Sequence, residues 1–220
     1  MWKVIKAVFY VIAPPGILAG GNALGALCWA KGPASPNLQA FSVGLAAGTA
    51  LWLLVGKRLE FFQTFEHELT HLLVGLCFFK RPHSFAATED QGGYVKMYGD
   101  NFFITLAPYF VPTLSLFALI LYPVIQPQYR LWFFGCLGLL SGYHLATTFQ
   151  EFGFDQTDVQ RCGKVFSVLF CLLGNLLFYG LIIGFVAGGP GGALAFLERA
   201  GDSCAAWGRL LAQWAGAVEG

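Results

Sequence analysis

The strongest constraint on the fold is a series of long apolar runs, which short polar segments separate. They cover residues 1–30, 38–56, 61–79, 102–124, 131–149 and 164–187. Only 11% of the residues are charged and 56% are hydrophobic, whereas soluble domains carry about 25% charged residues. Because a run of about 20 apolar residues can cross a bilayer, we predict an all-α polytopic membrane protein, a bundle of five to six transmembrane helices.

The polar segments suggest how the chain is divided. Residues 83–101 form the most polar stretch, and 91–99 alternate polar and bulky residues between glycines, which predicts a short β-hairpin. Residues 188–192 are rich in glycine, and an amphipathic helix that lies on the membrane surface is expected after them. We therefore predict an N-terminal transmembrane pair (1–60), a core with the hairpin (61–187) and a C-terminal surface helix (188–220).

The third apolar run carries the sequence His67-Glu68-Leu69-Thr70-His71, a His-Glu-x-x-His motif. Two histidines four residues apart lie on the same face of a helix and can hold one zinc ion, with Glu68 as the general base. The alternative is that both histidines pack within a helix bundle. Ionisable groups in a membrane segment are costly, however, and by default mark function. Glu66 is the better candidate for a surface ion pair with Lys57 or Arg58.

A catalytic zinc site usually has a third protein ligand and one open position. The residues that could supply this ligand are Glu151, Asp155, Asp158, His144 and His83. Spacing does not choose among them, although a carboxylate suits zinc sites that cleave peptides. His144 and Asn175, each inside an apolar run, could also support the site, but a packing hydrogen bond is the commoner role for such residues.

The motif, the hairpin and the later segment Gln156-Thr157-Asp158 together resemble the site-2 protease group, the M50 metallopeptidases, and in particular their M50B-like branch. The resemblance covers about residues 61–187. It implies that Asp158 is the third zinc ligand and that Gly92-Gly93-Tyr94 lie beside an extended substrate. The family usually has Asp-Gly where this chain has Asp158-Val159, so Asp155 stays open as an alternative ligand.

These features predict a zinc-dependent intramembrane endopeptidase with one Zn²⁺, acting on a transmembrane protein or peptide. The alternatives are a membrane zinc hydrolase of lipid or small amide substrates and a non-enzymatic metal-binding protein. A net charge of +1 without a basic patch argues against nucleic-acid binding. The six cysteines form no Cys-x-x-Cys pair and are expected to be reduced. We expect an integral, multi-pass protein of a bacterial inner or plasma membrane.

One geometric constraint follows from this interpretation. If every run after residue 60 crossed the membrane, Asp158 would lie on the face opposite the start of the motif, whereas zinc bonds are about 2 Å long. One segment must therefore stop short of crossing, or Asp158 must fold back. Pro108 and Pro112 mark residues 102–124 as a candidate for a broken helix.

Overall fold

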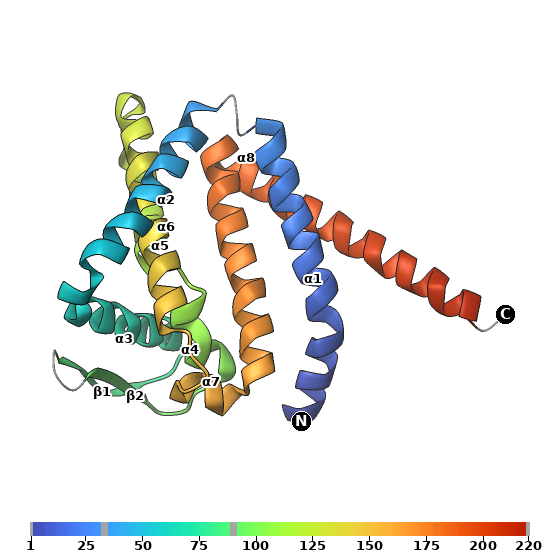
Figure 1. Cartoon of the computed structure of the whole chain (residues 1–220), viewed down its shortest axis with the longest axis horizontal. Helices are drawn as coiled ribbons and strands as arrows, with labels where there is room; N and C mark the ends of the chain where they lie inside the picture. The colour runs from blue at the N-terminus through green and yellow to red at the C-terminus, as the bar shows by residue number, and fades with distance from the viewer. Residues whose placement is uncertain (1, 32–34, 89–91, 219–220) are drawn as a thin grey trace. The chain divides into compact units, whose positions relative to one another are not determined.

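The computed structural model in Figure 1 describes residues 2–31, 35–88 and 92–218. The chain forms two compact units: residues 1–39 with 168–220, here the terminal unit, and residues 40–167, here the central unit. Asn175 belongs to the terminal unit and the other predicted site residues to the central one. The domain boundaries predicted above remain a prediction.

The terminal unit consists of α1 (Trp2–Lys31) and most of α8 (Lys164–Val218). α8 is broken at Gly188 and Gly189, and Gly189 has a φ of 62°, which favours glycine. Beyond the break the chain packs back on itself, because Phe196 is fully buried and contacts the helix at Gly180. The residues after the break are helical, and their predicted place on a membrane surface stays a prediction.

The central unit begins within α2 (Pro36–Val55) and continues with the 3-10 turn η1 (Gly56–Arg58) and α3 (Glu60–Cys77). The hairpin follows as β1 (Pro82–Thr88) and β2 (Gly92–Met97), which confirms the predicted strand pair. The remaining elements are α4 (Phe102–Leu106), η2 (Ala107–Tyr109), α5 (Thr113–Leu121), η3 (Tyr122–Val124), η4 (Pro127–Tyr129), α6 (Arg130–Glu151) and α7 (Thr157–Cys162).

The number of membrane-spanning helices is smaller than expected. In the described part of the chain, α1, α2 and α8 are long and apolar enough to cross a membrane. A fourth crossing results if the bent pair 102–109 and 113–124 counts as one span, so the predicted five to six are not confirmed. α3 is not among these helices, and it carries three carboxylates, Glu60, Glu66 and Glu68. α6 is not among them either.

The predicted break in residues 102–124 is confirmed. The two halves meet at an angle of 82° around residues 110–112. Pro112 has no N–H to donate and lies just before α5, where its φ and ψ are not helical. The chain therefore turns at this point instead of continuing as one helix.

This turn helps to satisfy the constraint on Asp158. In Figure 1, α3 runs across one end of the bundle of α2, α5 and α6, and the hairpin, α4 and α7 lie at that same end. α5 leads away from this end and α6 returns to it. Because α3 does not run along the bundle, the motif and Asp158 meet at the same end.

α2 and α6 approach each other closely through glycines. A Cβ on Gly44 would lie 1.9 Å from the carbonyl oxygen of Gly135, and one on Gly138 would lie 2.0 Å from that of Phe41. Close approach of two backbones through small residues is typical of helix packing in membranes. Next to this contact, Trp52 of α2 packs edge-on against Tyr143 of α6 and donates a hydrogen bond to Gln150. These contacts fix the end of α6, which carries Glu151, against α2.

Candidate metal centre

The helix α3 presents three faces about 120° apart at 100° per residue. The first carries Thr64, Glu68, His71 and Gly75, with His67 at its edge, and faces the hairpin and α7. The second carries Glu66 and Thr70, both buried against the rest of the central unit. The third is apolar and partly exposed. The motif therefore projects its ligands from one face while a second face fixes the helix in the unit.

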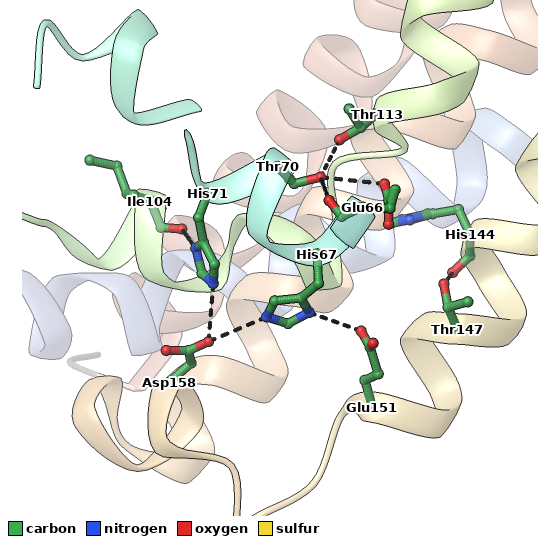
Figure 2. A network of polar contacts seen from close by, with 10 residues as sticks. All are labelled: Glu66, His67, Thr70, His71, Ile104, Thr113, His144, Thr147, Glu151 and Asp158. Carbon is green, nitrogen blue, oxygen red and sulfur yellow. Dashed lines mark hydrogen bonds and ion pairs between the residues drawn. The ribbon is translucent and has the colours of Figure 1, made fainter. Parts of the chain in front are cut away.

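The second face is held by a short polar network (Figure 2). The Thr70 hydroxyl lies 2.9 Å from the backbone carbonyl oxygen of Glu66 and 2.6 Å from the hydroxyl oxygen of Thr113 at the start of α5. Glu66 is buried and is therefore not the surface partner of Lys57 or Arg58 that the sequence suggested. The bond from Thr70 to Thr113 ties α3 to α5 and so fixes the rotation of α3 and the direction of its histidines.

The end of α3 is equally well defined. Lys80 N–H donates to the carbonyl oxygen of Gly75 and Phe79 N–H to that of Leu76, while Phe79 takes a φ of 57°. These bonds form a Schellman cap, in which glycine is the usual left-handed residue. The cap turns the chain sharply into β1, so that the hairpin returns along α3.

Three predicted ligands converge on one point. His71 Nε2 lies 3.3 Å from Asp158 Oδ2, and His67 Nε2 lies 3.7 Å from the same oxygen. In the described part of the chain, His67, His71 and Asp158 form a group whose ligand atoms lie within 4.8 Å of one another. Zinc bonds of about 2.0–2.1 Å at tetrahedral angles place ligand atoms roughly 3.3 Å apart. The donor set thus fits a single zinc ion.

The other nitrogen of each imidazole is already engaged (Figure 2). His71 Nδ1 lies 2.9 Å from the carbonyl oxygen of Ile104, which can only accept, so Nδ1 carries the proton. His67 Nδ1 lies 3.0 Å from Glu151 Oε2, a carboxylate at the end of α6. Such bonds fix the tautomer and the ring orientation of metal-binding histidines. Both Nε2 atoms are thereby left to face Asp158.

Asp158 reaches this point from the first turn of α7, which follows a short non-helical segment after α6. Burial would raise the pKa of the Asp158 carboxyl, but hydrogen bonds and positive charge from His67 and His71 outweigh it. They hold that pKa well below its usual range. Asp155 is exposed and is not part of the group. The geometry therefore groups Asp158, and not Asp155, with the two histidines.

Glu68 lies between this group and the hairpin. Its carboxylate accepts a hydrogen bond from the backbone N–H of Val95 in β2, and burial raises its pKa above the ordinary value. A Cβ on Gly93 would lie 2.6 Å from Glu68 Cγ and 2.8 Å from Thr64 Cγ2. Only glycine at position 93 lets β2 approach α3 this closely.

β2 presents its unpaired edge on this side. Tyr98 N–H donates to Arg81 ahead of β1, so by alternation Val95 directs its backbone groups away from β1. A cleft of about 740 Å³ lies alongside, lined by the metal group, Glu68, residues 93–97 and polar residues such as Asp100, Gln156 and Arg161. Arg161 pairs with Asp100 at 2.5 Å, which ties α7 to the segment ahead of α4. The cleft has room for an extended chain beside Glu68.

The other predicted site residues lie outside the group of His67, His71 and Asp158. Gly93 lines the cleft together with Tyr94, while Gly92, with a φ of 72°, starts β2 just beyond it. His144 is buried on α6, and its imidazole points toward Glu66 in Figure 2. Asn175 donates to the carbonyl of Cys171 one turn earlier in α8, in the terminal unit.

The sequence analysis missed the contacts that two residues, Glu151 and Tyr109, make with His67. Glu151 was considered only as a third ligand, and it instead bonds the far nitrogen of His67. Tyr109, which is fully buried, packs edge-on against the His67 ring. The position of Glu151 among polar residues at the end of an apolar segment marks it as a candidate site residue. Nothing in the sequence indicates that it contacts His67.

The comparison with protein families agrees with this geometry. The model of the Peptidase M50B-like family matches residues 40–149. The chain belongs to this family. No curated protein and no solved structure matches the chain. Membership indicates a metallopeptidase, and with three long apolar helices it indicates a membrane protein. The matched region of this M50B-like chain includes the His-Glu-x-x-His motif but ends before Asp158, so the family match does not bear on the role of Asp158.

Proposed function

We propose that this M50B-like protein is a zinc-dependent endopeptidase that hydrolyses peptide bonds of membrane-embedded substrates. The observation that carries the proposal is the position of Glu68. Its carboxylate lies between the group of three ligands and the edge of β2. A general base at this point is within reach of both a metal site and a strand that can pair with a substrate backbone.

The chain's own residues would contribute as follows. The substrate extends along the edge of β2, where backbone hydrogen bonds hold it as an added strand. A helical segment must unwind to do this, because its peptide groups are otherwise bonded internally. The extended backbone then passes Glu68 within the cleft, with Gly93 leaving room for the approach.

A zinc ion held by His67, His71 and Asp158 would supply Lewis-acid polarisation of the scissile carbonyl and activation of water at neutral pH. Glu68 accepts the proton of the attacking water and passes it to the leaving amine. Burial raises the pKa of Glu68, which makes the carboxylate a stronger proton acceptor. Glu151 and the Ile104 carbonyl keep both imidazoles turned toward the metal position.

The proposal is tested with the purified chain in lipid vesicles loaded with one equivalent of zinc. We expect cleavage of a transmembrane peptide, loss of cleavage with a zinc chelator, and recovery when zinc returns. The Glu68→Gln variant should bind zinc like the wild type but turn over at least about 100-fold more slowly, because base catalysis contributes about that much or more.

Three results would contradict this assignment. An active Glu68→Gln variant would exclude Glu68 as the base. Hydrolysis of lipid or small amide substrates without peptide cleavage would replace the peptidase with another hydrolase. Several exchangeable ions in place of one tightly held ion would indicate a metal-binding protein without this activity.

A further inference from the structure

The third face of α3 is apolar and partly exposed along the whole helix. It carries Phe62, Phe65, Leu69, Leu72 and Leu76, spaced three and four residues apart. Phe62 is 41% exposed, Phe65 37% and Leu76 47%. Phe62 and Phe65 contact Tyr143 of α6 and Phe85 of β1 with part of their rings. The outward part of this apolar stripe nevertheless stays exposed from Phe62 to Leu76.

We propose that this stripe lies against lipid at the boundary between acyl chains and headgroups, with α3 parallel to the membrane plane. α3 follows α2 after only four residues, 56–59, and α2 is apolar enough to span a membrane. The last turns of α2 expose Leu51, Leu53 and Leu54. The end of α2 and the stripe on α3 thus both expose apolar side chains close together in the sequence, as segments that face lipid do.

The ends of α3 support the same orientation. Arg58 precedes the helix, and Lys80 with Arg81 follow it, so cationic residues stand at both ends. A helix that crosses the membrane separates its two ends by the full bilayer, and cationic residues gather on one side. Cations at both ends of one helix fit headgroup phosphates on a single side. Phe61, Phe78 and Phe79 at the two ends are exposed, and phenylalanine is common on the apolar face of helices that lie in the interface.

The orientation has a consequence for the substrate, which rests on the proposed function. α3 would place His67, Glu68 and His71 at the edge of the bilayer, and the cleft beside them is lined by Lys96, Asp100 and Arg161. The bond to be cut would then lie where a transmembrane segment leaves the hydrocarbon.

The depth of α3 can be measured directly. Single cysteines at Phe62 and Leu76, in a chain without its six native cysteines, are labelled with an environment-sensitive fluorophore in phosphatidylcholine–phosphatidylglycerol vesicles. Lipids that carry a spin label either near the headgroup (shallow) or near the end of the acyl chain (deep) then quench the fluorophore according to its depth in the bilayer. We expect the shallow label to quench more strongly than the deep label at both positions. The ratio of shallow to deep quenching should be the same for Phe62 and Leu76. If α3 crossed the bilayer, these positions would differ in depth by about 21 Å, at about 1.5 Å per residue.

Two control positions calibrate the measurement. Val43, exposed midway along α2, should be quenched more by the deep label. Tyr98, exposed beyond β2, should be quenched by aqueous iodide and by neither lipid. A second pair, Phe65 and Leu72, replaces any variant that lacks wild-type circular dichroism.

Other outcomes overturn the proposal. Different ratios at Phe62 and Leu76 would mean that α3 crosses the membrane. Quenching of these positions by iodide would place the stripe in water. Protection from both lipid and iodide would mean that another protein or a second copy of the chain covers it. Because the measurement needs no activity, its failure is distinct from failure of the proposed peptidase.

Discussion

Glu151 lies 3.0 Å from His67 Nδ1, the nitrogen that points away from the other two ligands. The pair connects the last residue of α6 to the motif helix across 84 residues of sequence. A carboxylate in this position holds the imidazole in one tautomer and one orientation.

Removing this carboxylate should weaken metal binding. We expect Glu151→Ala to lower zinc affinity about 10–100-fold, since that is the usual effect of losing such a partner. Glu151→Gln keeps an oxygen that can accept a hydrogen bond from Nδ1, so its zinc affinity should fall between those of the wild type and Glu151→Ala. Affinity is measured by competition with a chelator. Equal affinity in wild type and Glu151→Ala would show that the contact does not orient the ligand.

The two acidic residues near α7 should behave differently. Asp158→Ala removes one of three converging ligands and should abolish retention of stoichiometric zinc through gel filtration. Asp155→Ala is the matched control, since Asp155 is exposed and outside the group. Metal analysis of both variants decides the matter, and zinc loss confined to the Asp155 variant would refute the assignment of Asp158.

The glycine contact between α2 and α6 can be tested with one methyl group. Gly138→Ala would place its Cβ 2.0 Å from the Phe41 carbonyl oxygen, so the helices must separate. We expect a loss of about 1–3 kcal/mol in the free energy of unfolding, as for other overpacked sites.

Gly135→Ala on the same helix is the control, because its nearest neighbour is 3.8 Å away. That variant should match or slightly exceed wild-type stability, since alanine favours helix over glycine. Both are compared by denaturation in detergent. Equal stability of the two variants would mean that α2 and α6 are not in this close contact.

Gly93 should matter for turnover without affecting metal content. Gly93→Ala would force β2 away from Glu68 Cγ and Thr64 Cγ2, and so displace the strand from the base. A misplacement of about 1 Å can cost about 100-fold in rate, so we expect a decrease of 10-fold or more in kcat. Gly201→Ala, at a position with open space, should leave the rate unchanged. Loss of zinc in Gly93→Ala would point to a structural effect instead.

Much of the site was predictable because its chemistry depends on local spacing. His67 and His71 share a face of any helix, and the apolar setting of Glu68 marked it as unusual. The alternation of polar and bulky residues between glycines predicted the hairpin, and Pro108 with Pro112 predicted the break between α4 and α5. Each of these signals lies within a few residues of what it predicts.

What failed depended on contacts between distant segments. Glu66 looked like a surface carboxylate, yet it is buried, because the rotation of α3 is fixed by Thr113 some 43 residues later. The apolar run at 61–79 was counted as a span because length and composition do not show whether a helix runs along a bundle or across its end. Spacing alone also did not choose among Glu151, Asp155, Asp158, His144 and His83 as third ligand, and only the resemblance to the M50B-like branch favoured Asp158. The position of α7 brings Asp158 to the two histidines and leaves Asp155 outside the group.

The two parts of the candidate metal centre differ in how firmly the chain itself holds them. The histidines belong to a helix of 18 residues that is capped at its end and bonded to α5, whereas Asp158 belongs to a helix of six residues between a non-helical segment and Gly163. Exchange of the ion should therefore begin with displacement of Asp158 while the histidine pair stays in place. A bound ion would hold residues 152–163 in place. Loss of the ion should first appear as faster amide hydrogen exchange in that segment.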